Sequence, residues 1–291
     1  MRLRTLLLSL AGVMCGAFVA LEEGSFSWPV LVFLILTTAS LQILSNMSNE
    51  LGDFLSGTDG DGRLGPNYSL SEGQVNLRDY RRVIVLFGLL SVLFGSLLTY
   101  FVFGTLFSWP ALSMLLLGAA AIWAAVRYTL GNKPYGYRGF GDIAVFVFFG
   151  LVAVMGGYFV MTRSFSQWTI LLPGMAYGFF SVGVLNVNNI RDRETDVATR
   201  VTVPIKIGVS NAKIYHVVLI VSGWLCMLLF SFLAFPFSGW HFLYLLALPL
   251  FVKHVRGVWR LSDSQLDPML PLLVVSSFVM SVLFGVGLMI S

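Results

Sequence analysis

The stretch WPVLVFLILTTASLQILSNMSNELGDFLSGTDGDG, residues 28–62, places a dense polar segment directly after a long apolar run. Residues 28–47 are almost wholly apolar and long enough to cross the roughly 30 Å hydrocarbon core of a bilayer as a helix. The polar side chains are Asn46, Asn49, Glu50, Asp53, Asp59 and Asp61. Because carboxylates at a membrane edge are costly and usually functional, the stretch predicts a membrane protein with chemistry at one end of a span.

The composition of the whole chain supports a membrane protein. The chain has 291 residues, of which 57% are hydrophobic and 11% charged, whereas soluble domains carry about 25% charged residues. The two cysteines lie in separate apolar segments, which argues against a disulfide framework or a cysteine-based metal site. The net charge of +4 is spread among short loops, so we expect no nucleic-acid partner. The three histidines are scattered along the chain, and we interpret them as packed or interfacial side chains: His216, His241 and His254.

Nine apolar runs of about twenty residues are each long enough to span a bilayer. They are approximately 5–21, 28–47, 82–103, 109–130, 142–161, 168–190, 213–234, 239–256 and 268–290. Short breaks containing Gly, Pro or charged residues separate them. The sequence therefore predicts an all-α integral membrane protein with nine transmembrane helices, in a single domain over residues 1–291.

The basic residues indicate the orientation of these spans. If the N-terminus is cytoplasmic, all of the 18 Lys and Arg residues except Arg163 fall in cytoplasmic segments, as the positive-inside rule requires. Four tryptophans near span starts form an aromatic belt at the other side: Trp28, Trp109, Trp168 and Trp240. We expect a multi-pass protein of the cytoplasmic (inner) membrane whose chemistry faces the cytoplasm. Residues 1–20 also resemble a signal peptide, an alternative that the charge sorting does not decide.

Two polar stripes end the second and sixth spans. The first consists of Asn46, Asn49 and Asp53, and the second of Asn186, Asn189, Asp192 and Asp196. Residues three and four positions apart share one face of a helix, so each set forms a stripe. A single aspartate at a helix end is usually a cap or a solvated residue, but two stripes of the same chemistry favour a shared site. Mg²⁺ prefers such oxygen ligands and is usually held by one or two carboxylates together with substrate phosphates, so the stripes predict a magnesium–diphosphate site.

Basic residues after the second stripe are candidates for binding phosphate, and the acidic loop after the first stripe raises the alternative of a calcium site. Arg200 and Lys206 follow the second stripe and could contact phosphate oxygens. An EF-hand loop that began at Asp59 would have Leu64 at position 6 and Leu70 at position 12, where glycine and glutamate are required, so a calcium loop is excluded.

A third segment, YTLGNKPYGYRGFGD, occupies residues 128–142. Its tyrosines and its arginine could hold an aromatic acid, by ring stacking and by an arginine–carboxylate pair. A glycine-rich turn whose cations reach the interface would explain the same residues. The sequence leaves both interpretations open.

The chain resembles the UbiA superfamily of intramembrane aromatic prenyltransferases through NMSNELGDFLSGTD, YGYRGFGD, NNIRDRETD and TVPIKIG. Within it the YGYRG block is most similar to the branch that prenylates 1,4-dihydroxy-2-naphthoate in menaquinone (vitamin K2) synthesis. The resemblance implies a helical bundle around a central cavity, with its active site at the cytoplasmic side. It also implies Mg²⁺-dependent transfer of a polyprenyl group from polyprenyl diphosphate to the naphthoate, with loss of CO₂ and diphosphate, to give demethylmenaquinol.

The resemblance also implies residue roles. The implied metal-binding residues are Asp53, Asp59, Asp192 and Asp196, of which Asp53, Asp192 and Asp196 are the catalytic set. The implied substrate- and diphosphate-binding residues are Asn49, Asn189, Lys133, Tyr137, Arg138, Arg200 and Lys206. Two positions depart from the family pattern: Glu50 stands where aspartate is frequent, and Arg200 where lysine is common.

Two other functions stay open at this level. A sibling prenyltransferase acting on another aromatic acceptor would share both stripes, although the YGYRG block argues against it. A cation-coupled transporter would also use membrane carboxylates, but it needs access from both sides and the polar residues lie mainly on one.

Overall fold

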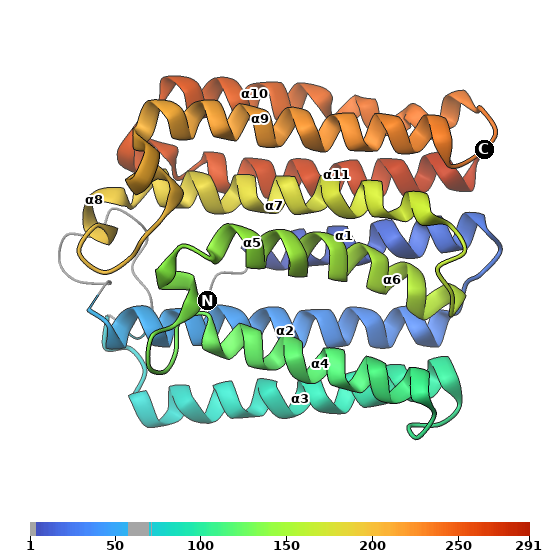
Figure 1. Cartoon of the computed structure of the whole chain (residues 1–291), viewed down its shortest axis with the longest axis horizontal. Helices are drawn as coiled ribbons and strands as arrows, with labels where there is room; N and C mark the ends of the chain where they lie inside the picture. Colours follow the sequence, from blue (N-terminus) through green and yellow to red (C-terminus); the bar gives the residue numbers. More distant parts are fainter. Residues whose placement is uncertain (1–3, 58–69, 71) are drawn as a thin grey trace.

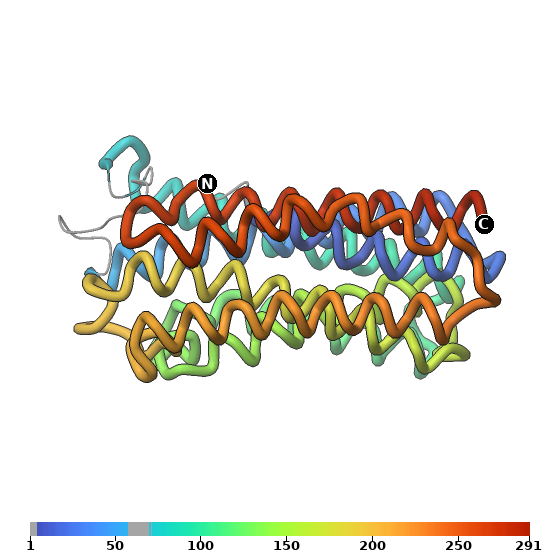
Figure 2. The backbone as a smooth tube through the Cα atoms, turned by 90° about the horizontal axis from the view of Figure 1, so that it is seen from above, coloured from blue at the N-terminus to red at the C-terminus, as the bar shows by residue number. Residues whose placement is uncertain are grey.

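A computed structural model describes residues 4–57, 70 and 72–291, and all regular secondary structure in that part of the chain is helical. The α-helices are α1 (Arg4–Glu22), α2 (Trp28–Leu55), α3 (Leu77–Phe103), α4 (Trp109–Arg127), α5 (Gly141–Val145), α6 (Ala153–Thr162), α7 (Leu171–Arg191), α8 (Arg193–Asp196), α9 (Val203–Leu233), α10 (Leu248–Arg260) and α11 (Met269–Met289). The 3₁₀ segments are η1 (Tyr135–Arg138), η3 (Trp168–Ile170), η4 (Gly239–Ala247) and η5 (Asp263–Leu266), and η2 (Phe146–Val152) is a π-helix. The long helices run along one common axis, as two perpendicular views show (Figures 1 and 2).

Nine helical segments in the described part of the chain are long and apolar enough to cross a membrane. Five of them are single helices, namely α1, α2, α3, α4 and α9. The other four join shorter elements end to end: α5–η2–α6, η3–α7, η4–α10 and η5–α11. The predicted all-α architecture and the predicted number of spans are therefore confirmed.

The N-terminal helix α1 lies inside the bundle, where it packs against α2, α6, α7 and α11. Its contact with α6 is close because both helices carry glycine at the crossing. A Cβ atom on Gly16 would overlap the carbonyl oxygen of Val154, and a Cβ atom on Gly157 would overlap that of Val13. Such backbone-to-backbone contact through small residues is a common way of packing helices in membranes. The position of α1 agrees with a membrane span that forms part of the bundle.

The second helix extends beyond the expected span. We predicted an apolar span over residues 28–47, but α2 continues to Leu55 and carries the first polar stripe on its last turns. The helix persists because this polar end is covered by protein: Asn46, Glu50 and Asp53 are all buried. The stripe therefore faces the inside of the bundle.

The seventh span also starts earlier than the expected residue 213, because α9 begins at Val203. Thr202 occupies the N-cap position in an extended conformation, and Pro204 lies in the first turn, where it costs no intrahelical hydrogen bond. Gly208 has a φ of 78°, a left-handed value that glycine adopts without strain, and it kinks the helix there. This kinked first segment brings the chain after the second stripe back towards the bundle.

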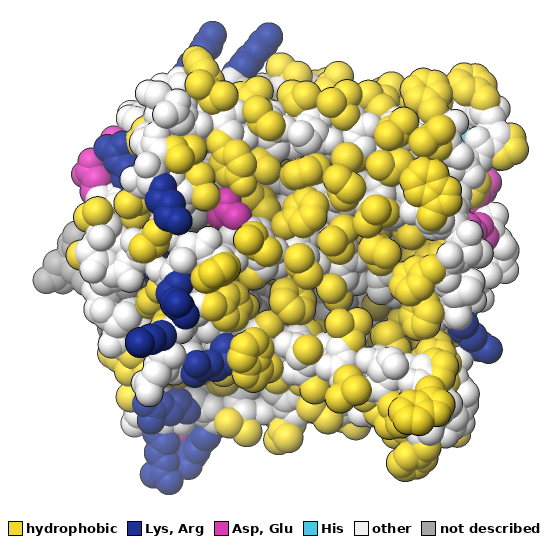
Figure 3. Space-filling view, in the orientation of Figure 1, with side chains coloured by type: hydrophobic (Ala, Val, Ile, Leu, Met, Phe, Trp, Pro, Cys, Tyr) yellow, Lys and Arg dark blue, Asp and Glu magenta, His cyan; other side chains and the backbone are white. Residues whose placement is uncertain are grey.

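The two ends of the bundle differ in chemistry. Helix α8 lies at one end, with the last turns of α2 and α7, and the C-terminus lies at the opposite end (Figure 1). On the face drawn in Figure 3, most Lys and Arg side chains gather at the α8 end. The four tryptophans of the expected belt are exposed and stand at the starts of α2, α4, η3 and η4. This arrangement agrees with the charge sorting read from the sequence.

Candidate active site

A cavity of about 560 Å³ runs inside the bundle from the end that carries the two stripes. Its walls come mainly from α1, α2, α4, α5–η2–α6 and α7. Apolar side chains such as Leu34, Met114 and Phe148 line its deeper part, and polar side chains cluster at the stripe end. The π-helix η2 contributes to this wall, and the surface is hollowed near the middle of the face in Figure 3. The cavity thus combines a polar end with an apolar interior.

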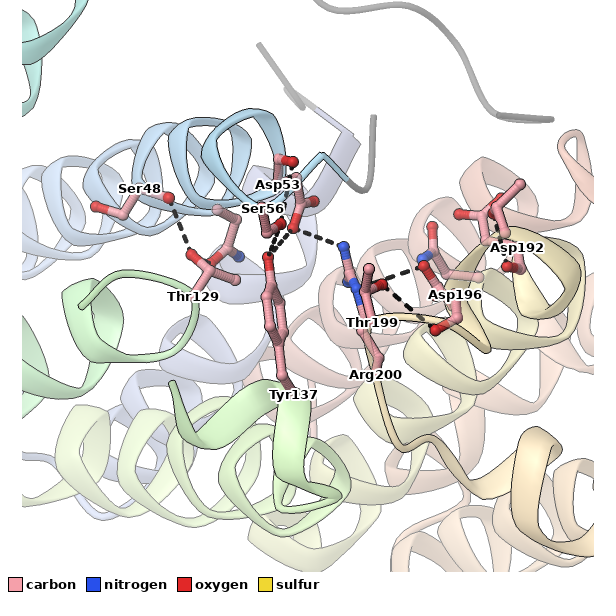
Figure 4. Close-up of polar contacts among 12 residues, drawn as sticks. Ser48, Asp53, Ser56, Thr129, Tyr137, Asp192, Asp196, Thr199 and Arg200 are labelled. Carbon is pink, nitrogen blue, oxygen red and sulfur yellow. Dashed lines mark hydrogen bonds and ion pairs between the residues drawn. The ribbon is translucent and has the colours of Figure 1, made fainter. Parts of the chain in front are cut away.

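Arg200 joins the two polar stripes. Its Nη2 lies 2.6 Å from Oδ1 of Asp53 at the end of α2, and its Nε lies 3.4 Å from Oδ1 of Asp196 in α8. The guanidinium points between the two carboxylates in Figure 4. Burial by itself would lower the pKa of Arg200, but the charges of Asp53 and Asp196 outweigh burial and the pKa is raised. The guanidinium therefore stays charged and links residues that are 143 positions apart.

Tyr137 of η1 completes this arrangement. Its hydroxyl donates a 2.8 Å hydrogen bond to Oδ1 of Asp53, and its ring centroid lies 4.7 Å from Cζ of Arg200. Burial, followed by the charge of Asp53, raises the pKa of Tyr137 to about 12, so the phenol keeps its proton. The backbone carbonyl of Tyr137 also accepts a 2.9 Å bond from the amide of Val201, which attaches η1 to the segment after the second stripe.

Three of the four stripe asparagines line the cavity, namely Asn46, Asn49 and Asn189, whereas the buried Asn186 donates a 3.0 Å hydrogen bond to the backbone oxygen of Ala212. Asn49 accepts a 3.2 Å hydrogen bond from the hydroxyl of Thr129, which also donates to the backbone oxygen of Ser48 at 2.9 Å. Asn189 is buried in the opposite wall on α7. Amide groups of both stripes and the carboxylate of Asp53 therefore line one cavity, while Asp192 and Asp196 are held by Arg191 and Arg200, which also line it.

Asp192 lies to one side of Arg200 and has a different partner (Figure 4). Both of its carboxylate oxygens lie 2.7 Å from nitrogens of the buried Arg191. The same guanidinium donates a 2.6 Å bond to Oδ1 of Asp267, which comes from the loop before α11. Arg191 and Asp267 line the cavity as well.

A further polar network lies in the wall formed by α1 and α2. Gln42 donates to Thr5 and to Asn46, each at 3.0 Å, and accepts a hydrogen bond from Ser9. All four side chains line the cavity. This uncharged network adds a polar surface to the cavity wall beside the first stripe.

Three predicted site residues lie outside this arrangement. Lys133 and Arg138 are exposed and do not line the cavity, although Tyr137 between them enters the site. Lys206 is exposed too, with its Nζ beside Gly139. Asp59 lies outside the described residues. A role in binding for these four residues stays a prediction.

Sequence reasoning missed several residues that the structure places in the site. Gln42 is four residues before Asn46 on the same helix face, so a longer stripe would have included it. Arg191 was visible only as one of many cations at a span end. Asp267 carried no local signal, because its partner Arg191 is 76 residues away.

The donor set fits Mg²⁺. Among the described residues, Arg191 pairs with Asp192 and Asp267, and Arg200 pairs with Asp53 and Asp196. These four carboxylates outnumber the two guanidiniums, so the site has a net negative charge. No three acidic, histidine or cysteine side chains of the described part are close enough to enclose an ion by themselves. Mg²⁺ bound here would therefore need waters and substrate phosphates to complete its coordination.

Comparisons with known proteins point to one family. Residues 9–285 match the UbiA prenyltransferase family. The 1,4-dihydroxy-2-naphthoate octaprenyltransferase of Escherichia coli (strain K12) is 35% identical over 100% of this chain and 94% of its own length. The enzyme of the same name from Haemophilus influenzae is 37% identical over 99% of this chain and 94% of its own length.

Solved structures with this fold are also similar. A UbiA homolog from Aeropyrum pernix K1 superposes with a TM-score of 0.75 at 15% identity and covers 100% of this chain and 98% of its own. A UbiA homolog from Archaeoglobus fulgidus bound to DMAPP and Mg²⁺ has a TM-score of 0.59 at 16% identity, with coverage of 97% and 99%. At these identities the likeness describes the fold.

Proposed function

The chain belongs to the UbiA prenyltransferase family, and from that premise we propose that it transfers a polyprenyl group from polyprenyl diphosphate to 1,4-dihydroxy-2-naphthoate. The reaction releases CO₂ and diphosphate and gives demethylmenaquinol, the precursor of menaquinone. The predicted family and enzyme class are confirmed by relatives of that activity that match over nearly the full length of the chain. The family match over residues 9–285 also supports treating residues 1–291 as a single domain.

One observation carries the proposal at the level of the site: Arg200 holds carboxylates of both stripes at the polar end of a deep apolar cavity. A prenyl diphosphate has the matching chemistry, with a highly charged head and a long apolar chain. Arginine binds diphosphate oxygens through a planar fork of N–H donors. We therefore place the diphosphate at Arg200 and the prenyl chain along the apolar wall.

The carboxylates of Asp53, Asp192 and Asp196 would hold Mg²⁺, with Asn49 and Asn189 as neighbouring oxygen donors. When bound, Mg²⁺ neutralises the diphosphate and makes it a better leaving group. The solved structure of the Archaeoglobus fulgidus homolog, bound to DMAPP and Mg²⁺, supports the use of Mg²⁺.

The residues of the chain supply orientation and exclude water. Tyr137 keeps its proton and donates to Asp53, so it fixes the direction of that carboxylate. Apolar and aromatic cavity walls, including Phe148 and Phe149, shield the allylic cation that forms when the diphosphate leaves. Aromatic ring faces attract such a cation. The electron-rich naphthoate ring then attacks the cation, and CO₂ leaves.

The acceptor requires a polar surface beside the reacting carbon. The network of Thr5, Ser9, Gln42 and Asn46 supports a position for its hydroxyl groups. Lys133 and Arg138 remain candidates for contacting an anion as substrates enter, and Lys206 for contacting the diphosphate. We propose the cytoplasmic membrane, with a cytoplasmic N-terminus, as the location of this multi-pass protein, because the basic residues and the two stripes share one end of the bundle.

The direct test incubates purified protein with Mg²⁺, a polyprenyl diphosphate and 1,4-dihydroxy-2-naphthoate, and detects the prenylated quinol by mass. Asp53→Asn is the matched control, since the amide has the same shape without the charge. Parallel reactions with 4-hydroxybenzoate separate the proposed enzyme from a sibling with another acceptor. A product with 4-hydroxybenzoate alone would assign the sibling function, and no product with either acceptor would contradict the proposal.

A further inference from the structure

Arg191 links Asp192 and Asp267 in a charge chain, in which Arg191 and Asp192 are buried and Asp267 is partly exposed; Arg191 and Asp267 line the cavity. Arg191 is 2% exposed, so its charge must be balanced by protein groups. It binds Asp192 through two nitrogens and Asp267 through the third, and its Nη2 also donates to Asn188 at 3.0 Å. Asp267 precedes Pro268 and α11, far in sequence from both stripes. The chain therefore attaches the C-terminal helix to the end of α7.

The charge balance of this group depends on Asp267. A guanidinium paired with one carboxylate is neutral overall, and such a pair attracts a cation weakly. A second carboxylate on the same guanidinium leaves the group with a net charge of −1. Since Asp192 and Asp267 share Arg191, Asp192 remains part of an anionic group although both of its oxygens are hydrogen-bonded.

We propose that Asp267 is a positioning residue for metal binding, acting through Arg191 on Asp192. The carboxylate of Asp267 balances part of the positive charge of Arg191, so Asp192 keeps its attraction for a divalent cation. Its hydrogen bond also anchors the guanidinium, which holds Asp192 in one orientation. This inference rests on the proposed function, in which Asp192 belongs to the metal site. Partners in the outer shell of metal sites orient the ligands in this way, and their loss typically weakens metal binding about 10- to 100-fold.

The test measures Mn²⁺ binding to purified protein by electron paramagnetic resonance, with a non-reactive prenyl thiolodiphosphate present and without acceptor. We expect Asp267→Asn to weaken Mn²⁺ binding about 10- to 100-fold. Asp267→Glu, which keeps the charge, should restore most of the affinity. The concentration of Mg²⁺ needed for half-maximal prenyl transfer should rise by the same factor, whereas kcat at saturating Mg²⁺ should change little.

Asp263→Asn is the matched control. Asp263 lies in the same loop, is exposed and adopts a left-handed φ of 48°, which asparagine tolerates. The substitution removes the same charge without touching Arg191, so Mn²⁺ affinity should stay within about twofold of wild type, as expected for a screened surface charge. An equal loss of Mn²⁺ affinity in Asp267→Asn and Asp263→Asn would mean that the loss comes from the change in net charge alone. That result would overturn the proposal.

Two further results separate a positioning role from a structural one. If Asp267 acts through Asp192, adding Asp267→Asn to an Asp192→Asn protein should change Mn²⁺ binding no further, because coupled residues are not additive. If Asp267 only attaches α11 to α7, Asp267→Asn will lower the melting temperature and leave Mn²⁺ affinity unchanged. That result refutes the proposal. Asp267→Ser is the second neutral variant, to be used if Asp267→Asn does not fold.

Failure of this inference and failure of the proposed function give different results. Normal Mn²⁺ binding by Asp267→Asn, with binding weakened in Asp192→Asn, would overturn only the role of Asp267. Absence of Mn²⁺ binding to the wild-type protein would overturn both this role and the metal site. Prenyl transfer itself is measured separately, by the mass of the product.

Discussion

Replacing Arg200 by lysine tests whether one guanidinium must serve both stripes. Arg200 uses Nη2 for Asp53 at 2.6 Å and Nε for Asp196 at 3.4 Å, and it also lies over the ring of Tyr137. Lysine has the same charge but a single nitrogen, so it can reach one carboxylate or the other. The variant thus keeps the positive charge but cannot contact both carboxylates at once.

The expected loss follows from the contact that lysine cannot make. If the lysine reached Asp196, the 2.6 Å hydrogen bond from Nη2 to Asp53 would be lost, and a hydrogen bond to a charged group contributes about 1.5–3 kcal/mol. Since about 1.4 kcal/mol corresponds to a factor of ten, kcat/KM for the prenyl diphosphate should fall about 10- to 100-fold. KM for the naphthoate should change much less, because we place the diphosphate and not the acceptor at Arg200. Steady-state kinetics with each substrate varied in turn measure both effects.

Arg193→Lys is the control for this experiment. Arg193 lies in the same segment and pairs at the surface with its neighbour Glu194, a contact worth about 0–1 kcal/mol. The variant should keep nearly full activity. If Arg200→Lys also retained wild-type kinetics with both substrates, the argument that Arg200 joins the stripes for catalysis would be refuted.

The remaining predictions concern the stripes, the η1 loop and the helix packing. Asp53→Asn and Asp192→Asn should each abolish prenyl transfer while the variants remain folded, because the carboxylate charge serves metal binding. Normal turnover by either purified variant would remove that residue from the site. Tyr137→Phe should reduce activity by the same factor at every pH below 10.0, because the wild-type phenol, with a pKa raised to about 12, stays protonated there. The hydrogen bond from Tyr137 to Asp53 is complete below pH 10.0 and is lost as the pH rises through about 12. A pH–rate profile of the variant that converges with wild type below pH 10.0 would count against this bond. If Arg138 binds a carboxylate or phosphate through two parallel hydrogen bonds, Arg138→Lys should bind that anion about tenfold more weakly. A raised KM for one substrate identifies the substrate that carries the anion. Unchanged kinetics in both Arg138→Lys and Arg138→Ala would mean that the exposed side chain only lies at the membrane interface. Gly16→Ala should destabilise the bundle by about 1–3 kcal/mol through overlap with α6, measured by thermal unfolding, and an unchanged melting temperature would contradict the close packing.

Much of the fold could be predicted from the sequence because membrane spans are encoded locally. An apolar run must form a helix in lipid, since every backbone group has to be hydrogen-bonded within the segment. Hydropathy alone therefore predicts nine spans, and the loop charges predict which ends lie together. Helices α2 and α9 extend beyond the apolar runs that the hydropathy defines. In α2 the polar extension is covered by protein, since Asn46, Glu50 and Asp53 are buried, whereas the first turns of α9 remain largely exposed.

The chemistry of the candidate site was predictable in kind for a similar reason. Helical periodicity places Asn49 with Asp53 and Asn189 with Asp192 on single faces, and oxygen-only stripes suit a hard cation. For the YGYRG block the sequence left a binding segment and a glycine-rich turn both open; the structure brings Tyr137 into a hydrogen bond with Asp53 and leaves Arg138 exposed. Neighbouring residues of a 3₁₀ turn point in different directions, and the sequence does not say which one reaches Asp53.

Only the tertiary structure decided which charged groups meet. Periodicity defines the faces of a helix, but the rotation of each helix and its neighbours follow from packing over the whole bundle. Arg200 reaches Asp53 across 147 residues, and Arg191 reaches Asp267 across 76. His216 and His254, which look scattered in the sequence, lie with their Nε2 atoms 2.8 Å apart between α9 and α10. The sequence by itself determined a helical membrane enzyme with two acidic stripes, while the fold determined the partners of each carboxylate, because those contacts form only when distant helices pack together.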